Sequence, residues 1–469
     1  MKERVFYVDS ERGDDDNAGT APGQAWKSLE RVNRQTFFAG DRLLFCSGGK
    51  WSGTLRPCGD GEPFRPVVIS SYGDGGRPLI DGAGGYAAVH LQGVSHYVVE
   101  NLAVTNRAGD RQIRQGICVE GKAEGITEDV TVRFCEVFEV DGQNVREAGP
   151  YQSMYWNGGI YVTMPGRSSQ KNHLHRIHIF RNHIHDVKTS GIRVNQEEDF
   201  INDIHHTCVV VRGNLIERTG SDGIIVANCI SPLIDGNRCL DAGALGVPEE
   251  TRLLAGIWVC ATSDALIQHN EVARTRMFSD DGTAFDTDWG TAGTTVFQYN
   301  YSHDNEGGFW LDCSSLNYNR EYHKTVLRYN ISLRDGRGVA VYDKGLDAEF
   351  YGNVFAFDRE ASLCVWDEGE SFLFRNNLFR LEKEPEDGWS QAAFLDNRYE
   401  ASVCPREQGE KPEERCEESG RESREERGAG GLDAAWLLAN AQDGTKWLDG
   451  KWELLCGMTM GKTGSGEKQ

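Results

Sequence analysis

The segment VVVRGNLIERTGSDGIIVAN, residues 209–228, contains a pattern that recurs along the chain. Two or three β-forming residues lead to a polar pair ending in Asn, two more apolar residues, a turn, and then Gly followed by an apolar strand. The same order occurs in VFQYNYSHDNEGGFWLDC (296–313) and in VLRYNISLRDGRGVAVYD (326–343). The repeated asparagines, spaced 23 to 33 residues apart, are Asn182, Asn214, Asn237, Asn270, Asn300, Asn330, Asn353 and Asn376.

This repeat predicts stacked strands. A unit of this length cannot bury its own apolar face, so successive units must stack on one another. Within each unit, Val, Ile, Phe and Tyr alternate with other residues at period two, which is typical of strands. Strands stacked about 4.8 Å apart form a parallel β-helix. We expect each repeated Asn to bond the corresponding Asn one coil away, and we assign it no functional role.

The repeats resemble those of the right-handed parallel β-helix, pectate-lyase-like superfamily, in its carbohydrate-active branch. The opening FYVDSERGDDDNAGTAPGQAWKSLERVN (6–33) resembles the N-terminal capping region of such proteins. This resemblance implies an all-β solenoid whose open end is covered by a short amphipathic helix, here at about residues 25–38. It leaves the reaction open, because the superfamily includes hydrolases, lyases, epimerases and adhesive shafts.

Composition and charge divide the chain and limit its partners. We expect a cap with the first coils (1–95), a β-helix with a catalytic face (96–400), a flexible acidic segment (401–431), and a C-terminal cap and tail (432–469). A net charge of −22 argues against a nucleic-acid partner. No apolar run is long enough to span a membrane. The 13 cysteines lack paired spacings, which favours a reducing cytoplasm. The oligomeric state is not predicted.

Alignment of the Gly-apolar strands separates inward from outward side chains. In GIYVT (159–163), GIWVC (256–260), AFDTD (284–288) and GFWLD (308–312), positions two and four should face the core. Positions three and five should then face out. These outward positions include Tyr161, Arg193, Trp258, Asp286 and Trp310 at position three, and Asn195, Asp288, Asp312 and Tyr342 at position five. Exposed indoles stack well on sugar rings, so Trp258 and Trp310 are predicted sugar-stacking walls. The alternative, that loops cover both rings as a secondary core, stays open.

Three aspartates form the predicted catalytic set. Asp286 and Asp288 lie two residues apart, and we expect Asp312 opposite Asp288 on the next coil. Carboxylates this close must share protons, which supplies the protonated acid and the ionised base of a glycosidase. The same oxygens also suit Ca²⁺, which a lyase would combine with Arg193 or Lys344 as its base.

These observations predict a glycoside hydrolase acting on an oligosaccharide or glycoside. A calcium-dependent polysaccharide lyase or uronate epimerase is the alternative, and a non-catalytic glycan-binding β-helix is the second. We expect no cofactor or metal unless the lyase alternative holds. The stretch NHLHRIHIFRNHIHDV (172–187) has no matching carboxylate or thiolate pattern, so we assign it no metal. The predicted substrate contacts are Trp258, Trp310, Arg193, Tyr161, Asn195, Asp222, His303, Tyr342 and Lys344.

Overall fold

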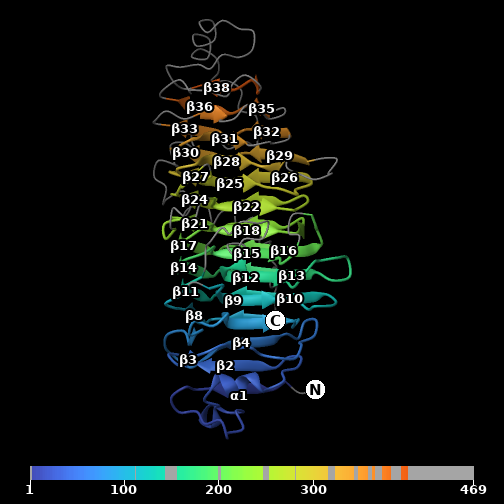
Figure 1. Cartoon of the computed structure of the whole chain (residues 1–469), viewed down its shortest axis with the longest axis vertical. Helices are drawn as coiled ribbons and strands as arrows, with labels where there is room; N and C mark the ends of the chain where they lie inside the picture. The colour runs from blue at the N-terminus through green and yellow to red at the C-terminus, as the bar shows by residue number, and fades with distance from the viewer. Residues whose placement is uncertain are drawn as a thin grey trace, which may run out of the picture.

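The computed structural model is a tall stack of coils, with its N-terminal end at the bottom of Figure 1. It describes residues 3–110, 112–142, 156–198, 202–246, 253–279, 281–314, 323–342, 347–357, 362–364, 372–381 and 392–399. Lys344 and the predicted segments 401–431 and 432–469 lie outside the described residues, as do the side chain of Tyr342 and the loop 143–155.

Three long sheets run along the stack, and each coil adds one strand to each sheet over most of its length. Neighbouring strands pair in parallel. Within the described residues, the first sheet comprises β1 (Val5–Val8), β2 (Arg42–Cys46), β4 (Val67–Tyr72), β7 (Tyr97–Glu100), β10 (Thr127–Arg133), β13 (Leu174–Phe180), β16 (His206–Arg212), β19 (Cys229–Ile230), β20 (Leu233–Asp235), β23 (Leu266–Gln268), β26 (Gly293–Gln298), β29 (His323–Arg328), β32 (Asp347–Tyr351), β35 (Phe372–Arg375) and β37 (Ala393–Leu395).

The second sheet comprises β3 (Lys50–Ser52), β5 (Leu79–Asp81), β8 (Ala103–Asn106), β11 (Glu136–Val140), β14 (His183–Val187), β17 (Leu215–Thr219), β21 (Arg238–Leu240), β24 (Glu271–Ala273), β27 (Tyr301–His303), β30 (Ile331–Leu333), β33 (Val354–Phe357), β36 (Leu378–Leu381) and β38 (Arg398–Tyr399). The third sheet, which carries the candidate site, comprises β6 (Ala87–Gln92), β9 (Gln115–Glu120), β12 (Gly158–Met164), β15 (Ile192–Gln196), β18 (Ile224–Ala227), β22 (Ile257–Cys260), β25 (Thr283–Thr287), β28 (Gly308–Asp312), β31 (Gly338–Tyr342) and β34 (Ser362–Cys364). The predicted all-β parallel helix is confirmed.

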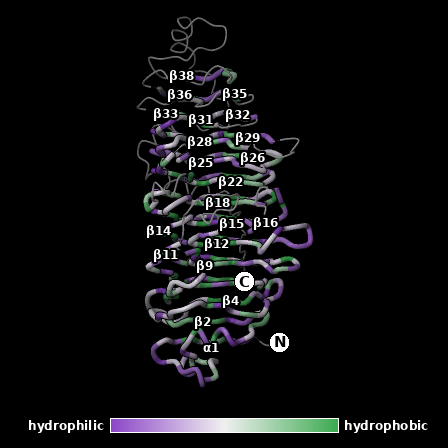
Figure 2. The backbone as a smooth tube through the Cα atoms, viewed as in Figure 1, coloured by the Kyte–Doolittle hydropathy of each residue, from purple (hydrophilic) through white to green (hydrophobic). Residues whose placement is uncertain are grey.

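The interior of the stack is one continuous apolar core. Apolar residues lie mainly along the strands, and hydrophilic residues predominate in the projecting loops (Figure 2). The glycines that begin the strands of the third sheet allow close contact with the next coil. A Cβ at Gly191 would lie 2.8 Å from the carbonyl oxygen of Gly223, and one at Gly223 would lie 2.5 Å from that of Gly256. This explains why Gly precedes the apolar strand in the repeat.

The predicted asparagine ladder is confirmed, with one correction. The side-chain nitrogen of Asn214 donates to Asn237 at 2.9 Å, and this arrangement repeats from coil to coil. The same oxygen also accepts the backbone N–H of that preceding asparagine, so Asn237 receives both bonds from Asn214. Beyond Asn353, however, the ladder continues through Asn377 and Asn397. Asn376 was the wrong residue: it is exposed and has a positive φ of 53°.

The N-terminal cap is smaller than predicted. Instead of a helix over residues 25–38, the chain forms a 3-10 turn, η1 (Pro22–Gln24), and one short helix, α1 (Leu29–Asn33). Ser28 caps α1 by accepting a hydrogen bond from the N–H of Arg31 at 3.1 Å. The helix lies at the N-terminal end of the stack in Figure 1. Within the described residues, no helix is long and apolar enough to cross a membrane.

Asn270→Ala should destabilise the stack, because the backbone N–H and side-chain amide of Asn237 and the carbonyl oxygen of Ile234 lose the buried partner that Asn270 provides. We expect a cost of about 1–3 kcal/mol, measured as a lower urea midpoint. Gln268→Ala is the control, since Gln268 bonds Gln298 on the partly exposed outer side of the adjacent sheet. Equal midpoints for the two variants would contradict a structural role of the ladder.

Candidate active site

The outer side of the third sheet carries one side chain from each coil in register. Tyr161 lies opposite Arg193, and Trp258 lies opposite both Ile225 and Asp286. The inward partners Ile160, Ile192, Ile224, Ile257 and Phe285 all belong to the main core. The predicted alternation of inward and outward positions is therefore confirmed from β9 to β25.

The alternation changes at β28, where the predicted alignment is wrong by one residue. Trp310 lies opposite Phe285, and Asp312 lies opposite Thr287 instead of Asp288. The Trp310 ring is 0% exposed, belongs to the main core and donates its indole N–H to Thr287 at 3.0 Å. Trp310 is thus a core residue and not a sugar-stacking wall.

Asp286 and Asp288 remain together near the end of β25. Asp286 is 6% exposed, and its Oδ1 has no hydrogen-bond partner among the residues that the structure describes. Burial raises its pKa well above the usual value, and the charges of Asp288, Asp281 and Asp312 raise it further. This environment therefore favours the protonated form of Asp286.

Asp288 is the more accessible of the two, since it is only partly buried. Burial raises its pKa to about 7, with a further contribution from the charges of Asp312 and Asp222. A 2.8 Å hydrogen bond from the N–H of Trp289 opposes this rise. Both neighbouring carboxyl groups therefore have raised pKa values, and burial is the main cause for each.

Asp312 contributes charge, although its carboxyl group is not accessible. The residue is fully buried, and its Oδ1 accepts the N–H of Ser314 at 2.9 Å. Its charge nevertheless raises the pKa of both Asp286 and Asp288. The predicted cluster of three acids thus exists electrostatically, but only Asp288 is open to a ligand.

Asp222 organises the neighbouring coils. Its Oδ1 accepts the indole N–H of Trp258 at 2.8 Å and the backbone N–H of Ala255 at 3.1 Å. Its Oδ2 accepts the hydroxyls of Ser190 and Ser221 and lies 3.5 Å from the guanidinium of Arg193. Because both oxygens are bonded within the protein and the residue is buried, Asp222 does not contact a sugar as predicted; it positions Trp258 and Arg193.

The other outward residues are also enclosed. Trp258 packs in a small outer cluster with Ile225, Ala227, Ala255, Cys260 and Ala261, so the secondary-core alternative holds for this ring. Arg193, Tyr161 and Asn195 are at most 3% exposed. These three side chains lie on the predicted face. Because they are buried, the structure does not support direct contact between them and a sugar.

His303 lies in another sheet. It belongs to β27, stacks on Tyr301, and is bonded to Asp304 at 2.7 Å and Glu271 at 3.3 Å. His303, a predicted substrate contact, therefore does not lie on the sheet that carries the candidate site. Tyr342 pairs with Asp312 through its backbone.

Three residues near the acids were not among the predicted site residues. Asp281 is partly exposed, and its charge acts on Asp286. Trp289 is partly exposed, and its indole N–H has no hydrogen-bond partner among the described residues. Burial is the main cause that raises the pKa of the Cys313 thiol. The charges of four aspartates raise it further: Asp286, Asp288, Asp281 and Asp312. The sequence could have indicated Asp281 and Trp289, because SDDGTAFDTDW (279–289) places four acids and an indole close together.

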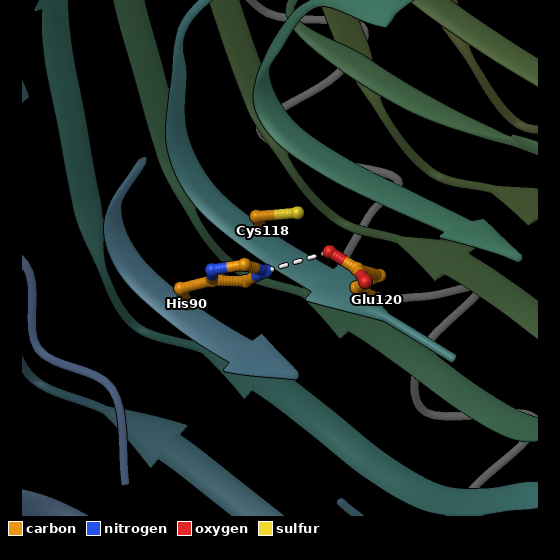
Figure 3. Close-up of side chains that lie close together, drawn as sticks. All are labelled: His90, Cys118 and Glu120. Carbon is orange, nitrogen blue, oxygen red and sulfur yellow. Dashed lines mark hydrogen bonds and ion pairs between the residues drawn. The ribbon is translucent and has the colours of Figure 1, made fainter. Parts of the chain in front are cut away.

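Two groups of described residues have spacings that suit a metal ion: His90 with Cys118 and Glu120 (Figure 3), and Glu136 with His183 and His185. In both, the ligand atoms lie within 4.8 Å of one another. No three of the described aspartates near β25 converge this closely. The calcium alternative therefore gains no support from them.

Comparison with known proteins gives relatives named as glycosidases. A lacto-N-biosidase of Bifidobacterium longum subsp. longum is 26% identical over 80% of this chain, but this chain spans only 28% of its length. An alpha-1,3-galactosidase A of Akkermansia muciniphila is 38% identical over 65 residues, covering 14% of this chain and 11% of that protein. The crystal structure of a GH136 lacto-N-biosidase from Eubacterium ramulus superposes with a TM-score of 0.67 at 23% identity, covering 85% of this chain and 68% of that one.

The last similarity concerns the fold alone, because the identity is low. A family model described as "Right handed beta helix region" matches residues 80–379, which is more than half of the chain. These residues include the asparagine ladder up to Asn377 and all the strands that carry the acids. The chain therefore belongs to the family of the right-handed β-helix region.

Proposed function

We propose that this protein is a glycoside hydrolase whose reaction centre lies at Asp288, at the end of β25. The observation that carries the proposal is a partly exposed carboxyl group with a pKa of about 7 beside a buried carboxyl group whose pKa is also raised. Hydrolysis of a glycosidic bond needs one carboxyl group that donates a proton and one that is ionised. This pair supplies both states near neutral pH.

The chemical roles follow from exposure. Asp288 is the more accessible of the two carboxyl groups, so it serves as the base or nucleophile. Asp286 holds a proton and serves as the acid, with the partly exposed Asp281 as the nearby group that can exchange it with the leaving oxygen. Asp312 raises both pKa values from a buried position without touching the substrate.

Trp289 is the sugar platform in this proposal. Its ring is partly exposed and packs against the outer cluster that contains Trp258. Its apolar ring face can stack on a sugar ring beside Asp288. Trp258 belongs to the buried cluster against which Trp289 packs, and it does not itself contact the sugar in this proposal.

The substrate class is a neutral oligosaccharide or glycoside. The negative charges of Asp288, Asp281 and Asp312 would repel the carboxylate of a uronic acid, which a lyase or an epimerase requires. Two relatives with glycosidase names support a hydrolase.

The cytoplasmic location stays a prediction. Nine cysteines among the described residues carry free thiols.

Asp288→Asn should lower kcat/KM by about 10²–10⁴, because it removes the ionisable base and keeps the shape of the side chain. Reducing ends released from a panel of neutral oligosaccharides and aryl glycosides measure this loss. Asp241→Asn is the matched control, since Asp241 pairs with Arg274 on another sheet. Full turnover by the Asp288 variant on an identified substrate would place the reaction centre elsewhere.

The pH profile should show an acidic limb near pH 7, because Asp288 must be ionised to act as base and its pKa is about 7. Below that pH, kcat/KM falls as Asp288 takes up a proton. In Asp312→Asn the limb should move to lower pH, since a charge that raises the Asp288 pKa is lost. A limb that stays in place or moves upward would contradict the electrostatic role of Asp312.

Asp286→Asn should reduce activity and stabilise the fold at high pH. The pKa of Asp286 is raised on folding, so its stability contribution is fully present below the unfolded pKa and is lost as pH rises through the folded pKa. Asn mimics the protonated acid and avoids that loss. Thermal melts should give a higher Tm than wild type at about pH 8–9 and a similar Tm at about pH 4. A lower Tm at the alkaline pH would show that Asp286 carries a needed charge.

A further inference from the structure

A second group of reactive side chains lies near the N-terminal end of the same sheet face. His90 on β6 lies opposite Cys118 on β9, and Glu120 follows two residues after Cys118, on the same side of the strand. The imidazole nitrogen, thiol sulfur and carboxylate oxygen lie within 4.8 Å of one another. Figure 3 shows the three side chains on two adjacent strands, with the imidazole joined to the carboxylate.

The geometry of this group is held by the protein. His90 Nε2 lies 2.9 Å from Glu120 Oε2, and the amide of Gln92 donates to the other oxygen of Glu120 at 3.1 Å. Cys118 is fully buried and His90 nearly so. Because parallel pairing fixes the two strands, the three atoms keep their spacing without the ordering cost of a mobile loop.

The donor set suits zinc. Thiolate, imidazole and carboxylate are the three protein ligands of Zn²⁺, with bonds of about 2.0–2.3 Å. Such bonds in a tetrahedron separate the ligand atoms by about 3–4 Å. Metal binding would bring the ligand atoms from within 4.8 Å to this spacing, and it would replace the His90–Glu120 hydrogen bond and the hydrogen bond between Tyr86 and the Cys118 thiol.

The charge around the group attracts a cation. In the described part of the chain, neither Glu120 nor Glu197 forms an ion pair with Lys or Arg. The charges of both carboxylates add to burial in raising the pKa of the Cys118 thiol. In the other group, by contrast, Arg77 already lies 3.6 Å from Glu136, which lowers its attraction for a cation.

We propose that His90, Cys118 and Glu120 form a binding site for a zinc-type divalent transition-metal ion, with one coordination position left open. On binding, the Cys118 thiol releases its proton to solvent and the sulfur bonds the metal. The site lies five to six coils from β25, about 24–29 Å along the stack at 4.8 Å per coil. It is therefore separate from the proposed reaction centre, and it clamps the first two strands of the third sheet.

Cobalt substitution tests this site directly. The full chain is freed of metal with a chelator, kept reduced and titrated with Co²⁺, whose thiolate complexes absorb in the near ultraviolet. We expect a thiolate-to-cobalt band that Zn²⁺ removes by displacement, and a higher Tm with Zn²⁺ than with chelator. Cys118→Ala should abolish the band, whereas Cys58→Ala, which removes an exposed thiol, should keep it.

Glu120→Gln provides a second variant in case Cys118→Ala fails to fold. It keeps the size and the hydrogen bonds of the side chain but removes its charge, so Co²⁺ and Zn²⁺ affinity should fall by about tenfold or more. His183→Ala should leave the band unchanged, since it alters the other candidate group. The absence of a thiolate band in the wild-type chain, or a band that survives in Cys118→Ala, overturns the proposal. So does unchanged affinity in Glu120→Gln.

Discussion

The hydrogen bonds between successive coils fix which side chains of this protein can meet. Each ladder asparagine satisfies the backbone N–H of the preceding asparagine and donates to the next, so the turn between the first two sheets has nearly the same conformation in every coil. Side chains alternate along a strand, so a shift of one residue exchanges inside and outside. The ladder holds one edge of each coil, while the third sheet follows a loop of variable length.

The acids lie where the loops that lead to the third sheet vary in length. Between the ladder and the strands of the third sheet, the chain inserts a variable number of residues, and the register changes between β25 and β28. The change brings Trp310 into the core and leaves Asp312 buried beside β25. A buried acid among acids lowers stability at neutral pH, and sites of this kind are often functional. The asparagine ladder and the continuous core offset that cost.

Much of the fold was predictable from the sequence, because its signals are local and repeated. The spacing of the asparagines and the Gly-apolar strands predicted parallel coils, and the alternation predicted the outward row through Asp286 correctly. The last ladder residue was misplaced because Asn376 and Asn377 are adjacent, and only the hydrogen bonds distinguish them. Trp310 was misplaced because Phe309 and Trp310 are both apolar, so the pattern fits two registers one residue apart. The length of α1 was overestimated, since the resemblance indicates a cap but not its extent.

The burial of the outward row could not be predicted, because it depends on loops that the repeat does not describe. Arg193 and Trp258 look like ligand contacts in the alignment, yet Asp222 binds both within the protein. This bonded aspartate still has an electrostatic effect at a distance, because its charge contributes to the raised pKa values of Asp286 and Asp288. Its partners reduce the cost of burying it without removing that effect. The protonation of the candidate site therefore depends on a residue two coils away that no ligand reaches, which is why the site cannot be understood from the accessible residues alone.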